Sequence, residues 1–219
     1  MRVYCKDIYK SFVDSNIDVL NGICLDIPSG GSLAISGPSG VGKSTLLNII
    51  AGLDDLDSGD IFFDNICFSK LSRSNKTLFR LNNISHIFQQ PNLLKDFNVL
   101  ENILLPLRYR GNSLKESREI ALSCLEDMSL LEHQESPISI LSGGEAQRVG
   151  IARAIAMKSK IILADEPTGN LDSSNSDLVI KTLIEICYSN MITLIIVSHD
   201  EKIIAKMNNK IRMIDGKVI

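Results

Sequence analysis

A glycine-rich segment at residues 37–44 constrains this chain more than any other feature of its sequence. The segment has the form Gly-x-x-x-x-Gly-Lys-Ser, follows a short apolar run at 33–35, and opens a stretch at 43–51 with apolar residues at helical spacing. Glycines let backbone N–H groups converge on phosphate oxygens, and a helix N-terminus adds a favourable partial charge. Lys43 would reach the β- and γ-phosphates, and the Ser44 hydroxyl would ligate Mg²⁺. The segment therefore predicts a nucleoside triphosphate site; the alternative is a glycine-rich turn without a ligand.

Other apolar runs end in polar clusters in the same way. The runs at 161–164 and 194–197 stop abruptly, as buried parallel strands do at the carboxyl edge of a sheet. Helix-length segments, among them 43–51 and 144–157, lie between the strands. This alternation predicts an α/β fold. We expect a single domain, residues 1–219, because this length is enough to bury one sizeable core.

The opening and the middle of the chain depart from this alternation. Val3, 19–25 and 61–68 are typical of short strands separated by turns, so we expect a small antiparallel sheet beside the parallel one. Further along, the strand signal stops and 114–131 has the pattern of an amphipathic helix. We therefore expect a helical insertion at about 91–158, between two halves of the parallel sheet.

Charge and hydropathy exclude several classes of protein. The 23 Lys and Arg against 26 Asp and Glu leave a net charge of −3, which argues against a general nucleic-acid binder. No apolar run exceeds four residues, far short of the roughly 20 that span a bilayer, and residues 1–10 are too charged for a signal peptide. We expect a cytoplasmic chain unless a partner holds it at a membrane. The cysteines are odd in number and lack a Cys-x-x-Cys pair, which predicts reduced core thiols at Cys5, Cys24, Cys67, Cys124 and Cys187.

Three polar side chains follow the later strands. Asp165 and Glu166 end the run at 161–164, at the sheet edge where the glycine-rich segment must also lie. Asp165 is suited to Mg²⁺, and Glu166 could polarise a water that attacks the γ-phosphate. His199 ends the run at 194–197 and could donate to the γ-phosphate or to that water. The alternative is that these are solvated loop acids and a structural histidine.

The sequence Leu-Ser-Gly-Gly-Glu at 141–145 forms a second helix start. Ser142 can cap the helix, and the two glycines leave the N–H groups unobstructed, so this is another potential anion site. The alternative is a well-capped helix without a ligand. Spacing alone does not explain why one chain would need two such sites.

Taken together, these motifs resemble those of the ATP-binding-cassette (ABC) ATPases, over essentially all 219 residues. The order of 37–44, Gln89, 141–145, 161–166, Leu171-Asp172 and His199 is that of the family, and Leu-Ser-Gly-Gly-Glu is highly specific to it. The resemblance implies a P-loop NTPase fold with a RecA-like parallel core sheet, an antiparallel β subdomain and a helical insertion. It also implies a head-to-tail homodimer, in which 142–145 of one chain close on ATP held by the other.

The resemblance assigns roles residue by residue. Gln89 would sense the γ-phosphate and Mg²⁺, and Asp172 would communicate across the dimer. Phe12 stands where the family usually has a tyrosine that stacks on adenine, with Tyr9 as the nearby competitor. The implied catalytic residues are Lys43, Gln89, Glu166 and His199, and the implied Mg²⁺ ligands are Ser44, Gln89 and Asp165. The implied ATP contacts are Phe12, Gly37, Pro38, Ser39, Gly40, Val41, Gly42, Lys43, Ser44, Thr45, Ser142, Gly143, Gly144, Glu145 and Asp172.

Within the family, the residues after Pro167 and those at 92–102 resemble the group that serves lipoprotein release, macrolide or peptide export, and a cell-division complex. Two residues depart from the pattern: Ala146 stands where Gln or Arg is common, and Gly150 where Ala is. Gly150 should weaken its helix by about 0.5–1 kcal/mol relative to Ala. Neither change removes a phosphate ligand.

The expected partner is a separate membrane permease that holds the chain at the cytoplasmic face of the inner membrane. The stretch from Gln89 to Arg110 has more apolar residues than a loop normally exposes, which predicts a docking surface that includes Leu93, Leu94, Phe97, Val99 and Leu100. The alternative is that these residues pack the helical insertion. A soluble ABC protein acting on DNA or ribosomes would need a second cassette or a long arm. A GTPase would need an Asn-Lys-x-Asp motif, which the sequence lacks.

Overall fold

The computed structural model describes residues 1–12, 17–169 and 173–219. Its strands form two sheets, as the sequence predicted. The core sheet has the order β10-β9-β3-β8-β7-β6, in which the strands from β9 to β6 run parallel and β10 is antiparallel. These strands are β3 (Ser32–Ser36), β6 (Ile84–Ile87), β7 (Ile161–Asp165), β8 (Thr193–Val197), β9 (Asn209–Ile214) and β10 (Lys217–Val218).

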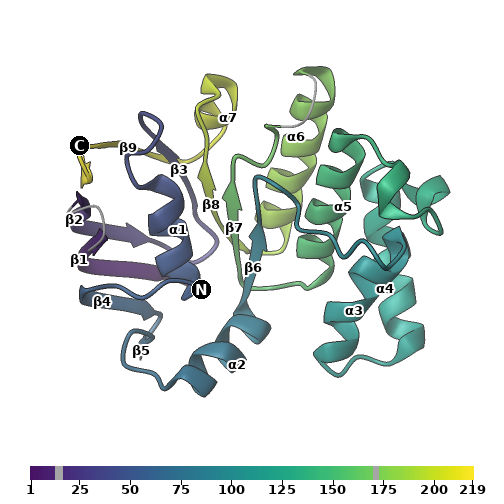
Figure 1. Ribbon diagram of the computed structural model, residues 1–219, viewed down its shortest axis with the longest axis horizontal. Coiled ribbons are helices and arrows are strands. Elements are labelled where there is room, and N and C mark those ends of the chain that lie inside the picture. Colours follow the sequence, from purple (N-terminus) through teal and green to yellow (C-terminus); the bar gives the residue numbers. More distant parts are fainter. Residues whose placement is uncertain (13–16, 170–172) are drawn as a thin grey trace.

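The second sheet is antiparallel and has the order β2-β1-β4-β5. It consists of β1 (Val3–Phe12), β2 (Ile17–Ile27), β4 (Ser58–Phe63) and β5 (Ile66–Cys67). Helix α1 (Lys43–Ala51) lies between this sheet and the core sheet (Figure 1). The helix buries Leu46, Leu47 and Ile50 in a hydrophobic cluster to which both sheets contribute. The antiparallel sheet therefore packs, through α1, on the face of the core sheet that carries the glycine-rich segment.

The core strands are apolar on both faces because both faces are covered. Along β7, Ile161 and Leu163 point into the cluster around α1, whereas Ile162 and Ala164 point into the cluster on the opposite face. Successive side chains of a strand face opposite sides, so a strand covered on both sides is a continuous apolar run. The second cluster is covered by α5 (Gly143–Ala156) and α6 (Ser173–Ser189).

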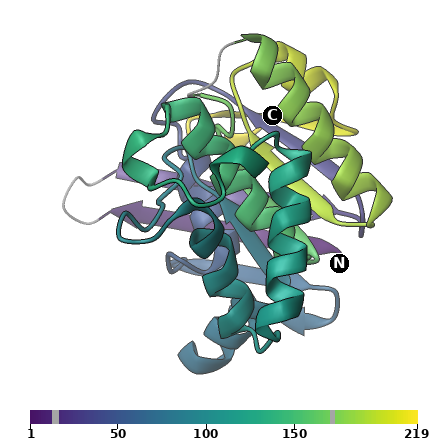
Figure 2. The same cartoon turned by 90° about the vertical axis from the view of Figure 1, so that its right-hand side faces the viewer.

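Helices α3 (Val99–Tyr109), α4 (Leu114–Asp127) and α5 pack against one another and stand in front of the core sheet in Figure 2. All three lie within the predicted insertion. Asn98 begins α3 with a capping box and Ser113 caps α4, which explains where these helices start. Short 3₁₀ turns at Leu131–His133 and Ile138–Ile140 join α4 to α5.

Some expectations from the sequence were wrong. Val99 and Leu100 are buried in the helical core, so they cannot belong to a docking surface. The sequence also did not predict α2 (Arg73–Asn83), a polar helix in which only Phe79 is buried. Cys24 is exposed and Cys67 is half-buried, so they are not core thiols.

Helix α7 (Glu201–Ala205) follows β8 and completes the described elements. Its N-cap is Asp200, the residue directly after His199. No described helix is both long enough and apolar enough to cross a membrane.

Candidate functional site

Phe12, most of the glycine-rich segment and the predicted catalytic residues meet in a cleft of about 580 Å³ at the carboxyl edge of the core sheet. Each wall comes from a different element: the loop between β3 and α1, the ends of β6, β7 and β8, and the antiparallel sheet. The lining residues are Phe12, Val19, Gly37, Ser39, Gly40, Gly42, Lys43, Ser44, Thr45, Gln89, Asp165, Glu166, Val197 and His199. The parallel strands bring these groups together because their carboxyl ends share one edge of the sheet.

The loop before α1 is a phosphate-binding loop in its backbone geometry. Gly42 caps the helix with φ at 100°, and Gly37 has φ at 145°, in a region that L side chains rarely adopt. A Cβ on Gly37 would also collide with the Met213 carbonyl. No acidic residue occupies the first turn of α1, so its N-terminal N–H groups and partial positive charge face the cleft unopposed.

Two members of the loop do not line the cleft themselves. The Pro38 carbonyl accepts a hydrogen bond from Lys43 Nζ at 2.7 Å, and the Gly37 carbonyl accepts another at 2.9 Å. These contacts hold the Lys43 ammonium against its own loop, at the mouth of the cleft. Val41 is partly buried and packs against the cluster around α1. Pro38 and Val41 therefore shape the loop.

Glu166 occupies a strained backbone position directly after β7. Its φ is 44°, which is uncommon for a residue with a side chain, and its N–H donates to the Val197 carbonyl at 3.0 Å. That bond ties the ends of β7 and β8 together. It also turns the carboxylate toward His199, whose Nδ1 lies 2.9 Å from Glu166 Oε1.

His199 extends from the end of β8 with most of its ring in solvent. The hydrogen bond and charge of Glu166 raise the pKa of His199 above its ordinary value. His86 is different, since its ring stacks on Phe88 with centroids 4.1 Å apart and burial lowers its pKa to about 4. Glu166 therefore favours the protonated form of His199, whereas His86 is a neutral packing residue.

Phe12 and Gln89 line the cleft from different elements. Phe12 lies at the end of β1, with 40% of its surface exposed and Lys10 Nζ 5.4 Å from the ring centroid. Tyr9, its competitor, instead places its hydroxyl beside Gly22 of the neighbouring strand. Gln89 lies just after β6.

The oxygen donors in the cleft suit a hard cation. Ser44, Gln89 and Asp165 contribute a hydroxyl, an amide and a carboxylate. Mg²⁺ prefers such oxygen ligands and shares them with phosphate oxygens and water. Among the described residues, no group of three or more His, Cys, Asp or Glu side chains forms a metal site of another kind.

The motif at 141–145 lies outside this cleft. Ser142 caps α5: its Oγ accepts from the Glu145 N–H at 3.3 Å and donates to Glu145 Oε2 at 2.7 Å, while its own N–H also donates to Oε2. These hydrogen bonds from Ser142 hold the pKa of the Glu145 carboxyl below its ordinary value. The other oxygen of Glu145 lies 3.5 Å from His133 Nε2, a contact the sequence did not predict. Gly143 and Gly144 form the first turn, and Asp172 lies outside the described residues.

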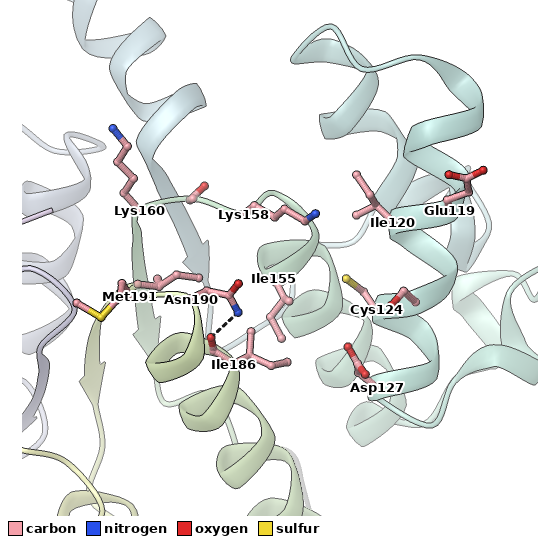
Figure 3. Close-up of a pocket in the computed structure, with 13 residues that line it drawn as sticks. Glu119, Ile120, Cys124, Asp127, Ile155, Lys158, Lys160, Ile186, Asn190 and Met191 are labelled. Carbon is pink, nitrogen blue, oxygen red and sulfur yellow. Dashed lines mark hydrogen bonds between the residues drawn. The ribbon is translucent and has the colours of Figure 1, made fainter.

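A second cavity, of about 520 Å³, lies between α4, α6 and the end of α5 (Figure 3). Two of its polar groups have structural explanations: Asn190 Nδ2 donates to the Ile186 carbonyl, and burial raises the pKa of the Cys124 thiol to about 11. A thiol that stays protonated is a poor nucleophile. This cavity therefore offers no chemistry comparable to that of the cleft.

Sequence comparisons agree with the geometry. The sequence model of the ABC transporter family matches residues 20–169. The lipoprotein-releasing system ATP-binding protein LolD of Bdellovibrio bacteriovorus is 39% identical over 213 residues, which cover 96% of this chain and 97% of that protein. The protein of the same name from Leptospira interrogans is also 39% identical, with 97% of this chain and 89% of that protein covered.

Solved structures give the same result. The dimeric ATP-binding cassette MJ0796, in a post-hydrolysis state bound to ADP and Pi, superposes with a TM-score of 0.93 at 36% identity, covering 99% of this chain and 96% of that one. CbiO1 from Clostridium perfringens, part of the ABC transporter complex CbiONQ, superposes with a TM-score of 0.87 at 30% identity. The superposition covers 99% of this chain and 86% of that one.

Proposed function

This chain belongs to the ABC transporter family and is an ATP-hydrolysing subunit of that family, and we propose that it powers a separate membrane-spanning partner in lipoprotein release. The meeting of Lys43, Glu166 and His199 in one cleft carries the catalytic part of the proposal. The relatives named for lipoprotein release, similar over nearly the whole chain, favour that role over export of peptides or macrolides.

The cleft suggests how the residues divide the work. The exposed face of Phe12 would stack on adenine, and the loop N–H groups with Lys43 would hold the phosphates. Ser44, Gln89 and Asp165 would hold Mg²⁺, which neutralises charge that develops on the phosphates. Glu166, turned into the cleft by its backbone, would accept a proton from the attacking water.

His199 supports Glu166 in this proposal. Its Nδ1 contacts Glu166, so the remaining ring nitrogen is the one that can donate to the γ-phosphate. Hydrolysis requires the attacking water oxygen, the γ-phosphorus and the leaving bridging oxygen to lie in line. Glu166 and His199, at the ends of β7 and β8, would orient the water for that attack.

A second copy of the chain would complete the site. Ser142 to Glu145 lie outside the cleft of their own chain and form a capped helix start in which Gly143 and Gly144 make up the first turn. In the proposed head-to-tail dimer, the α5 N-terminus closes on ATP in the partner's cleft. The likeness to the dimeric MJ0796 supports this arrangement.

The membrane partner would dock on the surface around α3, within the stretch from Gln89 to Arg110. Leu94, Phe97, Leu105 and Tyr109 are exposed apolar side chains of this stretch. Docking there would hold the chain at the cytoplasmic face of the inner membrane.

The Glu166→Gln variant tests the catalytic proposal. It should bind ATP with wild-type affinity, lose nearly all hydrolysis and accumulate an ATP-bound dimer, because the amide cannot accept the water's proton. Steady-state phosphate release, nucleotide binding and gel filtration with ATP measure the three effects. Glu185→Gln, an exposed carboxylate on α6, is the matched control. Near-normal hydrolysis by Glu166→Gln would remove Glu166 from the catalytic role.

A further inference from the structure

Helix α5 holds the segment that carries Gln89. Gln147 of α5 is fully buried, and its Nε2 donates to the Phe88 carbonyl at 3.0 Å. Arg153, further along the same helix, donates to the Pro91 carbonyl at 2.6 Å and to the Asn92 carbonyl at 3.1 Å. These carbonyls belong to the irregular segment 88–92, which follows β6, so α5 side chains supply hydrogen bonds that a sheet would otherwise provide.

Gly150 completes this side of α5. A Cβ added there would meet Pro91 Cβ at 3.0 Å, which is closer than most such contacts, so the segment lies directly against the helix at this point. Gln147, Gly150 and Arg153 are spaced three residues apart and therefore lie along one side of α5. We call this set the α5 contact face. It gives a packing reason for a glycine that departs from the family's usual alanine.

Arg153 makes its two hydrogen bonds from a partly buried position. Partial burial lowers the pKa of Arg153, because removal from water disfavours the charged form. A partly buried guanidinium is tolerated when its N–H groups find acceptors, and here the acceptors are two carbonyls of segment 88–92. Asn92 itself has φ at 46°, an uncommon backbone conformation that Arg153 helps to hold.

Gln89 lies inside the held segment, one residue after Phe88 and two before Pro91, and its side chain lines the nucleotide cleft. We propose that Gln147, Gly150 and Arg153 are positioning residues that place Gln89 against the nucleotide. This inference rests on the role proposed above for Gln89.

The experiment removes the N–H donors of the α5 contact face and measures whether the resulting loss of kcat depends on Gln89. Arg153→Met keeps much of the side-chain volume but cannot donate. It should lower kcat for ATP about tenfold while KM stays within about twofold, because a displaced Gln89 affects the transition state more than binding. In a Gln89→Ala background the same change should lower kcat by less than about twofold, since coupled residues are not additive. Arg118→Met, an exposed arginine on α4, is the matched control.

Two further variants keep the test decisive if Arg153→Met folds poorly. Gln147→Met removes the bond to Phe88, and Arg153→Lys keeps one donor group and should recover part of the lost kcat. Equal losses of kcat with and without Gln89 would mean that the contact face serves stability alone, and would overturn the inference. If Gln89→Ala by itself leaves hydrolysis unchanged, the role proposed for Gln89 fails as well. If Gln89→Ala is defective and the α5 variants are not, only the present inference fails.

Discussion

At the scale of single residues, Glu166 and His199 depend on each other. The left-handed backbone of Glu166 and its bond to the Val197 carbonyl aim the carboxylate at the His199 ring. Backbone strain of this kind costs about 1–3 kcal/mol and persists where the surrounding structure enforces it. The motif Asp-Glu-Pro predicted a carboxylate at the sheet edge, but its spacing could not predict the contact with a residue 33 positions away.

The titration of His199 tests this contact. Because Glu166 raises the pKa of His199, the ring should titrate above about 6.5, its ordinary value, in an NMR pH series. The folded pKa exceeds the unfolded one, so the pair stabilises the fold fully below the unfolded pKa and loses that contribution as pH rises through the folded pKa. Glu166→Gln should lower the His199 midpoint. A midpoint that does not move would place the two side chains apart in solution.

At the scale of elements, α5 does more than its pattern indicated. Its amphipathic spacing predicted a core helix, and its start predicted a cap, both of which the structure contains. The contact face was not predicted, since a buried Gln147 and a partly buried Arg153 have no characteristic spacing of their own. The polar helix α2 was not predicted either, because it has almost no buried side that would produce a periodic apolar pattern.

The segment before α3 is the element that the membrane partner would meet. Phe97→Glu places a charge on a ring that is 38% exposed, so the fold and basal hydrolysis should be unchanged. Co-purification with a co-expressed permease of the lipoprotein-release type should be lost, because a charge in an apolar interface is left without a partner. Leu178→Glu, at an exposed position of α6, is the matched control. Loss of solubility would assign Phe97 to the core, and unchanged co-purification would move the docking surface elsewhere.

At the scale of the whole molecule, two of the predicted nucleotide-binding segments lie apart. The cleft at 37–45 and the α5 N-terminus at Ser142 do not meet within the described chain. In the proposed head-to-tail dimer each copy would contribute both segments, so the two-fold symmetry would close two equivalent sites.

Mixing two inactive variants tests that symmetry. Ser142→Arg should fill the anion pocket of the opposite chain, and Lys43→Ala should lose phosphate contacts in its own cleft. A mixed dimer has one site with both defects and one with neither, so equal mixing should restore about a quarter of wild-type hydrolysis. Each variant alone is the control. If no activity returns, a cysteine cross-link would be sought between the 37–45 loop of one chain and the 142–145 turn of its partner. Cross-linking would mean that the head-to-tail arrangement is right and that both sites must act together. The absence of cross-linking would mean that the arrangement is wrong.

The amino-acid sequence by itself determined the α/β class, the antiparallel sheet, the phosphate loop and the sheet-edge positions of Asp165, Glu166 and His199. These features depend on local backbone chemistry, on periodic patterns within segments and on the rule that parallel strands end at one edge of a sheet. Each of them can therefore be recognised without knowing which side chains pack together. Only the tertiary structure decided that Val99 and Leu100 are buried, that Cys24 is exposed, and that α5 holds segment 88–92. Those outcomes depend on which surfaces meet after packing, and partners some 60 positions apart leave no periodic trace in the sequence.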